Sequence, residues 1–176
     1  MRNATELLTG YAEYHRDRRN IATHLIGVPM IVFGVGVLLA RPAFALGGLA
    51  LSPAWILFAL TAAWYLSRGD LIVGAAVSIV VGVLIALAHG VAYGSTASWL
   101  AWGLGSFVVG WVIQFVGHYF EGRKPAFVDD LAGLLVGPMF VTAEVLFALG
   151  LCQPLHAEIV RRSGPTSIRE RPQTHA

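Results

Sequence analysis

Long apolar blocks separated by short polar linkers constrain the fold of this chain more than any other feature of its sequence. The blocks cover residues 25–40, 43–66, 71–88, 99–116 and 131–152. A helix needs about 20 apolar residues to cross the hydrocarbon core of a bilayer, which is about 30 Å thick. Only 12% of the 176 residues are charged, whereas a soluble domain carries about 25%. The sequence therefore predicts an all-α fold, a multi-span transmembrane helical bundle.

Basic residues indicate how this bundle is oriented. The predicted spans are 25–40, 43–66, 71–88 and 97–118, and their linkers are short enough to make consecutive helices antiparallel neighbours. Cytoplasmic segments of membrane proteins are enriched in Lys and Arg. Because arginines precede the first span, we expect the N-terminus to face the cytoplasm. Counting spans from there places the polar segment after the fourth span on the same side.

The two ends of the chain depart from the pattern of spans. Residues 5–15 are predicted to form an amphipathic helix on the membrane surface, with Thr5 as its N-cap. For 131–152 we expect a broken helical hairpin that returns to the cytoplasm, because a full fifth span would leave the following arginines outside. The expected break is Gly137-Pro138, since proline removes a helical hydrogen bond.

Composition and motifs exclude several classes of function. Cys152 is the only cysteine, which excludes an intrachain disulfide and a cysteine-based zinc site. The basic residues lie in short linkers and form no single basic face, which argues against a nucleic-acid partner. The chain has no Gly-x-Ser-x-Gly turn and no Gly-rich phosphate loop. We expect one membrane-embedded catalytic domain over 1–160 and a polar, disordered tail over 161–176.

A polar cluster just before the first span contains His15, Asn20 and His24. In one continuous helix, the two histidines would be separated by about 13.5 Å and half a turn. Metal–nitrogen bonds of about 2.1 Å cannot bridge that gap. Either the histidines belong to separate sites, or the chain leaves helical geometry between Arg16 and Asn20. In the second case we expect Asn20 to be the N-cap of the next helix.

A second polar cluster, at the end of the fourth span, contains Gln114, His118 and Glu121. Their spacing places them on one helical face. They are either a polar stripe that packs against other helices or part of a metal site in which His118 and Glu121 are ligands. Histidine and carboxylate with open positions favour Fe(II) and oxygen chemistry, whereas zinc would favour hydrolysis. By the span count, His89 lies on the opposite face and has a structural role.

Together the two clusters resemble a known family, the membrane-bound 2-hydroxy fatty acid dioxygenases of phytosphingosine degradation. The first motif is Tyr-x3-His-x4-Asn-x3-His-x2-Gly-Val-Pro, formed by Tyr11, His15, Asn20, His24, Gly27, Val28 and Pro29. The second is Trp-x2-Gln-Phe-x-Gly-His-x-Phe-Glu-x-Arg-x-Pro-Ala, formed by Trp111, Gln114, Phe115, Gly117, His118, Phe120, Glu121, Arg123, Pro125 and Ala126. The stretch from Gly137 to Glu144 is also similar to the family's C-terminal segment.

The resemblance implies an Fe(II)-dependent α-oxidation. In that reaction a 2-hydroxy long-chain fatty acid reacts with O2, loses its carboxyl carbon and leaves a fatty acid one carbon shorter. The histidines of the family fall on His15, His24 and His118, which are therefore expected to hold the iron. Glu121 or Glu144 is a candidate for a further ligand.

The residues themselves are compatible with such a substrate. The tail of a lipid would lie between the spans, while its carboxylate and 2-hydroxyl reach the interface and chelate the iron. Three cations at that interface are candidates to pair with the substrate carboxylate, namely Arg19, Arg123 and Lys124.

Asn20, Gln114 and Glu144 are the expected catalytic residues beside the metal ligands. The bend at Gly137-Pro138 should bring Glu144 against the bundle, where its carboxylate would accept a hydrogen bond from a ligand histidine or from Gln114. The alternative is a protonated Glu144 bonded to a backbone carbonyl.

Three other classes of function stay open at this point. A transporter or channel predicts polar residues at mid-membrane, of which Glu144 is the clear example. A non-catalytic membrane scaffold needs no cluster of histidines at one face. Another metal-dependent lipid enzyme, such as a zinc hydrolase, would use similar ligands. We expect the inner membrane in a bacterium or the endoplasmic reticulum in a eukaryote, and the sequence allows one iron or two and any oligomeric state.

Overall fold

The computed structural model describes residues 2–46, 49–128 and 130–168 of the chain. Helices dominate this part, with one small two-stranded sheet. In chain order the elements are α1 (Ala4–Ala12), α2 (Arg18–Ala40), β1 (Phe44–Leu46), β2 (Leu49–Leu51), α3 (Pro53–Leu66), α4 (Leu71–Ala92), α5 (Thr96–Glu121), η1 (Ala126–Val128), α6 (Gly133–Ala148) and α7 (Gln153–Ser163).

Three helices in this part of the chain are long and apolar enough to cross a membrane, namely α2, α4 and α5. The pair α6 and α7 passes the same test as one unit but is bent by 116°. The multi-span helical bundle with a broken C-terminal hairpin is therefore confirmed. Large apolar side chains on the outer faces are exposed, among them Leu60, Ile79 and Val108, as expected for surfaces that contact lipid.

The second predicted span, 43–66, is wrong as a continuous helix. Its first part forms the antiparallel pair β1 and β2, and α3 begins only at Pro53. The Ser52 hydroxyl accepts a hydrogen bond from Trp55 N–H, and proline suits the first helical turn, so the two residues together start a helix. The 14 residues of α3 span about 21 Å, less than the hydrocarbon core.

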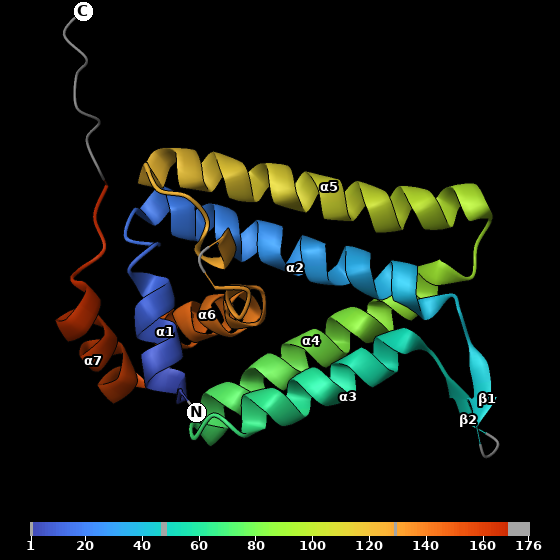
Figure 1. Ribbon diagram of the computed structural model, residues 1–176, viewed down its shortest axis with the longest axis horizontal. Helices are drawn as coiled ribbons and strands as arrows, with labels where there is room; N and C mark the ends of the chain where they lie inside the picture. The colour runs from blue at the N-terminus through green and yellow to red at the C-terminus, as the bar shows by residue number, and fades with distance from the viewer. Residues whose placement is uncertain (1, 47–48, 129, 169–176) are drawn as a thin grey trace, which may run out of the picture.

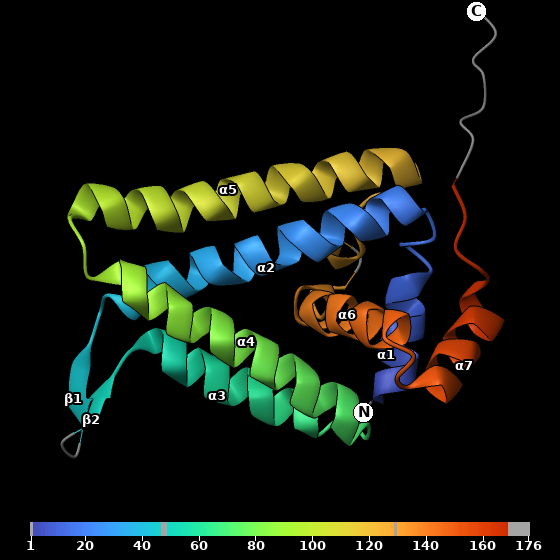
Figure 2. The same cartoon turned by 180° about the vertical axis from the view of Figure 1, so that it is seen from behind.

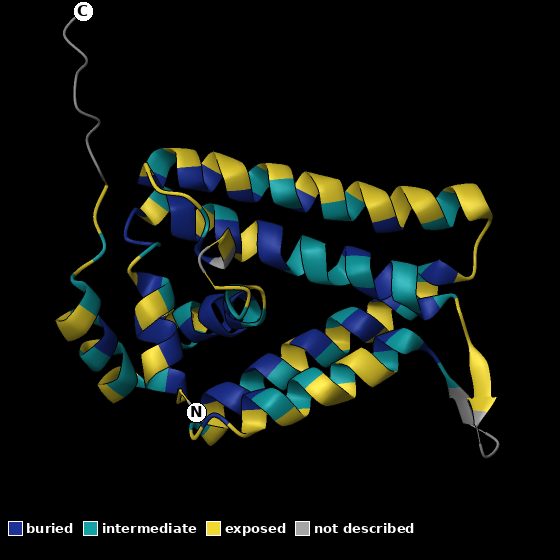
Figure 3. Cartoon of the chain, in the orientation of Figure 1, coloured by how far each residue is buried: buried dark blue, intermediate teal, exposed yellow. Residues whose placement is uncertain are grey.

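The long helices form two antiparallel pairs, α2 with α5 and α3 with α4 (Figures 1 and 2). Helices α2 and α5 run side by side and antiparallel, and the α3–α4 hairpin diverges from them toward the end where the N-terminus lies. Helix α6 lies between α2 and α4 at that end and contacts both, and α1 packs against α6 and α7. Figure 3 shows buried residues on the inward faces and exposed residues along the outer sides of α3 and α5.

Glycines set the contact between α2 and α5. A Cβ added at Gly27 would lie 2.9 Å from Gly110 O, and one added at Gly34 would lie 2.7 Å from Gly103 O. Both distances are too short for any side chain, so the backbones touch. On each helix the paired glycines are two turns apart, which keeps them on one face. Gly117 continues the row and packs against the first turns of α2, where its Cβ would overlap Thr23 Oγ1.

The chain leaves helical geometry between α1 and α2, which is the second of the two alternatives, but over residues 13–17 and so earlier than the expected interval from Arg16 to Asn20. Both predicted caps are wrong. The α1 cap is Asn3, whose side chain accepts from Glu6 N–H, so Thr5 lies inside the helix. The α2 cap is Asp17, which accepts from Arg19 N–H. Asn20 therefore falls inside the first turn, where its side chain is free for other contacts.

The bend in the C-terminal hairpin also lies elsewhere than expected. Helix α6 continues through Gly137-Pro138, because a proline in the second turn removes a single intrahelical bond near the helix start. The chain turns instead after Ala148, where Gly150 and Cys152 adopt positive φ angles of 79° and 52°. A glycine takes that conformation without strain. Gly150 is therefore a better indicator of the end of α6 than Gly137-Pro138.

The segment after α7 is held by backbone hydrogen bonds. Ser167 N–H donates to Arg16 O at 2.9 Å, and Arg18 N–H donates to Ser167 O at 3.1 Å. Residues 161–163 belong to α7. The disorder expected for 161–176 is therefore not seen over 161–168, and the remainder of that tail lies outside the described residues.

The glycine contact between α2 and α5 predicts the result of an alanine substitution. Gly110→Ala should lower the free energy of unfolding by about 1–3 kcal/mol, because the new methyl group would lie 2.8 Å from the backbone oxygen of Gly27. The matched control is Gly105→Ala on the same helix, where nothing lies within 4 Å of an added Cβ. Thermal unfolding in detergent measures both. Equal stability of the two variants would contradict the backbone contact.

Candidate metal site

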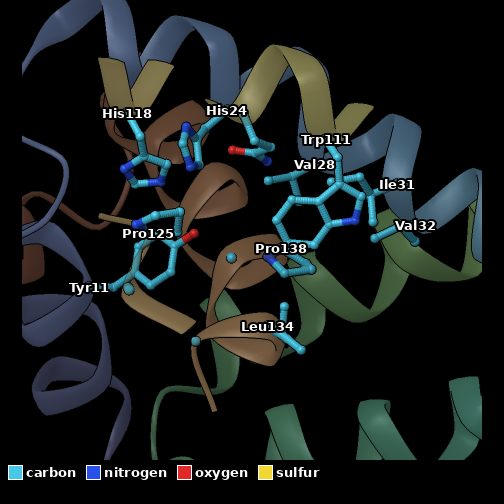
Figure 4. A pocket seen from close by; sticks show the side chains of 14 residues that line it. Tyr11, His24, Val28, Ile31, Val32, Trp111, His118, Pro125, Leu134 and Pro138 are labelled. Carbon is cyan, nitrogen blue, oxygen red and sulfur yellow. The ribbon is translucent and has the colours of Figure 1, made fainter. Parts of the chain in front are cut away.

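Three histidines from separate elements meet at the end of the bundle where α2 begins and α5 ends. His15 lies in the turn between α1 and α2, His24 in the second turn of α2, and His118 in the last turn of α5. One ring nitrogen from each lies within 4.8 Å of the other two, and all three residues are buried. Figure 4 shows His24 and His118 beside Tyr11 at one end of a pocket. The convergence expected from the sequence is therefore seen.

Hydrogen bonds orient the imidazoles of His15 and His24. His15 Nδ1 donates to Tyr11 O at 2.7 Å, and His24 Nδ1 donates to Asn20 O at 2.8 Å. Each ring with its proton on Nδ1 has a lone pair on Nε2. A histidine that binds a metal through one ring nitrogen usually donates a hydrogen bond from the other, often to a backbone carbonyl.

The two Nε2 atoms of His15 and His24 lie 3.0 Å apart. Two lone pairs at that distance repel each other unless a cation lies between them. Two nitrogens each about 2.1 Å from one ion, at right angles, are about 3.0 Å apart. The observed separation therefore fits two ligands of one metal ion, and His118 is in place to be a third.

The surroundings favour the neutral form of His15. Burial lowers the pKa of His15 well below its ordinary value, and the nearby His24, His118 and Arg16 lower it further, whereas the hydrogen bond to Tyr11 O raises it. Metal binding requires an unprotonated imidazole, which is the form that burial favours at His15.

Glu121 supports the turn that carries His15 rather than joining the histidines. Its Oε2 accepts from Asp17 N–H at 2.8 Å and from Asn20 Nδ2 at 3.1 Å. The Asn20 carbonyl in turn accepts from His24. Among the described residues, the group that can share one ion consists of the three histidines alone. The carboxylate expected as a ligand thus connects the end of α5 to the start of α2.

Two aromatic rings that also contact each other pack on His15. Tyr11 stacks on its ring at a centroid distance of 4.1 Å and an interplanar angle of 5°, and Phe140 of α6 lies at 5.4 Å. Sequence reasoning placed Tyr11 in the motif without this role and missed both Phe140 and Asp17. The spacing of Tyr11 and His15 by four residues, and an aspartate directly before α2, were the available signals.

A pocket leads away from the histidines. The space open to a water molecule is about 60 Å³, and its polar lining residues are Tyr11, His24, Gln114 and His118. Gln114 is buried, and within the described chain its Oε1 has no hydrogen-bond partner. A buried acceptor without a donor is costly, so a bound molecule with a hydroxyl group would satisfy it.

The cations expected at the substrate carboxylate lie away from this pocket. Arg19 pairs with the Asp17 carboxylate at 2.7 Å and lies over the ring of Phe120. Arg123 donates to Glu13 O at 3.0 Å and, with Lys124, lines a separate surface hollow. Charge and proximity in sequence do not show which way a long side chain points, which is why this expectation differs from the structure.

Glu144 does not make the hydrogen bond predicted for it. Because α6 is unbroken at Gly137-Pro138, Phe140 is the residue that reaches His15, and Glu144 lies a turn further along. Glu144 instead interacts electrostatically with Arg16. Within the described chain, Glu144 therefore has no direct bond to the histidines or to Gln114.

Comparisons with known proteins agree with this geometry. The family described as 2-hydroxy-palmitic acid dioxygenase Mpo1-like matches residues 1–149. The 2-hydroxy-palmitic acid dioxygenase MPO1 of Saccharomyces cerevisiae is 33% identical over 152 residues, which cover 85% of this chain and 83% of the yeast protein. No solved structure matches the chain.

Metal binding should depend on each of the three histidines. His15→Ala, His24→Ala and His118→Ala should each reduce metal affinity at least about tenfold, because losing even a residue behind a ligand has that effect. The matched control is His89→Ala, since His89 also donates from Nδ1 to a helix carbonyl but contacts Ser52 and Trp55 at the other end of the bundle. Metal content after purification is the measurement. If one of these three variants keeps the full metal content of the wild-type protein, the histidine it lacks is not a metal ligand.

Glu121 should prove to be a support and not a ligand. Glu121→Gln keeps an acceptor oxygen for Asp17 N–H and should retain the bound metal. Glu121→Ala leaves two buried donors without that acceptor and should cost about 1–3 kcal/mol of unfolding free energy for each. Metal content and thermal unfolding separate the two effects. Loss of metal from the glutamine variant, at wild-type stability, would instead make Glu121 a ligand.

Proposed function

The chain belongs to the Mpo1-like family, and from this premise we propose that it is an Fe(II)-dependent dioxygenase that shortens 2-hydroxy long-chain fatty acids by one carbon. The observation that carries the proposal is the buried trio His15, His24 and His118, in which two Nε2 atoms face each other at 3.0 Å. Imidazole ligands with open positions suit the binding of Fe(II) and of O2.

The proposed reaction balances without a further co-substrate. A 2-hydroxy acid, R–CHOH–COOH, and one O2 give R–COOH, CO2 and water. The bond between the carboxyl carbon and the hydroxyl-bearing carbon breaks, and that second carbon becomes the new carboxyl group. The four electrons removed from the acid reduce the O2. A site for a nicotinamide or for another reductant is therefore not required.

The chain's own residues have distinct tasks in this proposal. The three histidines would hold Fe(II), which when bound would supply the activation of O2 and a positive charge for the carboxylate and 2-hydroxyl of the substrate. The buried Gln114 Oε1 accepts a hydrogen bond from the 2-hydroxyl, since it lines the same pocket and has no other donor among the described residues. Asn20 and Glu121 keep His24 and the α1–α2 turn in place. Tyr11 and Phe140 pack on His15 and keep water from it.

The site is proposed to face the cytoplasm. The end of the bundle that holds the histidines also carries Arg16, Arg18 and Arg19, together with Arg123 and Lys124 after α5. Basic residues mark the cytoplasmic side of a membrane protein. A fatty acid in the adjacent leaflet would reach the site without leaving the bilayer.

Turnover of a labelled acid tests this function. Detergent-purified protein loaded with Fe(II) should convert 2-hydroxypalmitate labelled at carbon 1 into pentadecanoate and labelled CO2, with one O2 consumed per product. Palmitate and 3-hydroxypalmitate are the controls, and neither should react, because each lacks the hydroxyl that completes the chelate. Fe(II)-loaded His118→Ala protein should be inactive. Turnover without O2, or equal turnover with zinc in place of iron, would favour a different metal enzyme and contradict the proposal.

A further inference from the structure

A second cavity continues from the histidine pocket into the centre of the bundle. Its volume is about 400 Å³, and residues from α2, α3, α4, α5 and α6 form its walls. The residues that it shares with the histidine pocket are Ile31, Val32, Trp111, Leu134 and Pro138. Figure 4 shows Trp111, Ile31, Val32, Pro138 and Leu134 together on the side of the pocket away from His118. The two spaces therefore adjoin along these five residues.

The α2 and α5 residues that line the two cavities follow one face of each helix. On α2 the series is His24, Val28, Ile31 and Val35, and on α5 it is His118, Gln114, Trp111 and Phe107. Steps of three and four residues keep each series on one helical face. Because the helices are antiparallel, both series begin at the histidines and run in the same direction.

The second cavity is lined almost entirely by apolar groups. Its two hydroxyl side chains already donate hydrogen bonds, Thr61 Oγ1 to Phe58 O and Tyr65 OH to Leu135 O, each at 3.0 Å. Trp111, which both cavities share, adds one indole N–H, and the other lining residues are aliphatic, phenylalanine or proline. A hydrocarbon chain therefore suits this space, because a polar group buried there would lose most of its hydrogen bonds to water.

The depth of the cavity matches a long acyl chain. Val35 lies eleven residues beyond His24 on α2, which corresponds to about 16 Å along the helix axis. One leaflet of a bilayer contributes about half of a 30 Å hydrocarbon core. A chain of membrane length would thus reach from the histidines to Val35 and Phe107.

We propose that this cavity is the acyl-chain channel of the protein and that its deep end, at Val35, Phe107 and Ile85, limits the length of the chain. The inference rests on the proposed function, because a 2-hydroxy acid whose head is at the histidines must place its tail somewhere. Trp111 packs against the chain where the two cavities meet. Leu57 of α3 and Leu134 of α6 line the channel and are 42% and 48% exposed, so the wall of the channel includes apolar side chains that also reach the outer surface.

Filling the deep end tests the channel by chain length. Val35→Phe should lower kcat/KM for 2-hydroxypalmitate at least tenfold and leave that for 2-hydroxyoctanoate unchanged, because the shorter chain ends before position 35. The matched control is Val108→Phe, the same change at a side chain that is 55% exposed on α5, which should alter neither value. If the ratio of kcat/KM for 2-hydroxypalmitate to that for 2-hydroxyoctanoate is the same in Val35→Phe as in the wild-type protein, the proposed channel is wrong.

Photo-crosslinking of the wild-type protein gives a second test that needs no turnover. Fe(II)-loaded protein is irradiated without O2 in the presence of 2-hydroxypalmitate with a diazirine near its methyl end. Label should appear on residues of the deep end, such as Val35, Phe58, Ile85 and Phe107. Label confined to the outer face of α5, at Val108 or Val109, or no label at all, would overturn the channel even if Val35→Phe fails to fold.

The two tests separate this inference from the function on which it rests. Label at the deep end without turnover in air would support the channel and contradict the dioxygenase. Turnover of 2-hydroxypalmitate without label at the deep end would support the dioxygenase and contradict the channel.

Discussion

The backbone contact between α2 and α5 is the constraint on which the rest of the structure depends. Where glycines face each other, at Gly27 with Gly110 and at Gly34 with Gly103, neither helix can slide or rotate without a clash. The register that results places the first turns of α2 beside the last turns of α5. His24 and His118 meet for that reason, although they lie far apart in the sequence. The same register aligns the two rows of side chains that lead from the histidines into the channel.

The candidate metal site is a polar cluster inside a largely apolar helical bundle, so its polar groups must find hydrogen-bond partners within the cluster. Most buried polar residues in the described chain lie there, including His15, Asp17, Asn20, Gln114 and Glu121. Backbone carbonyls and the Glu121 carboxylate accept hydrogen bonds from several of the donors, and the facing nitrogens of His15 and His24 have the spacing of two ligands of one ion. Ion binding there would couple to the stability of this end of the bundle. The rest of the interior is mostly apolar and encloses the channel.

Hydrophobic pattern and helix geometry were sufficient to predict the bundle and to place the two polar clusters at one end of it. The break between His15 and His24 was one of two alternatives, and the resemblance to a family implied that the three histidines act together. The prediction of a full second span was wrong because an apolar run shows burial but not conformation, and Ser52 with Pro53 starts the helix late. Glu121 was expected at the metal because spacing identifies a helix face, not the partner opposite it. The expected contacts of Arg123 and Glu144 also differ from the observed ones. The tertiary fold decides which neighbours a long side chain such as Arg123 can reach. Glu144 lies elsewhere than expected because a proline near the start of a helix does not have to bend the helix.

The hydrogen bonds of Ser167 with Arg16 and Arg18 have a consequence for biosynthesis. The turn that carries His15 is synthesised early. Ser167, whose backbone pairs with Arg16 and Arg18 at the end of that turn, is synthesised more than a hundred residues later. His118 also leaves the ribosome long after His15 and His24. The three histidines can therefore come together only after α5 has been synthesised, and the backbone pairing of Ser167 with Arg16 and Arg18 only after α7.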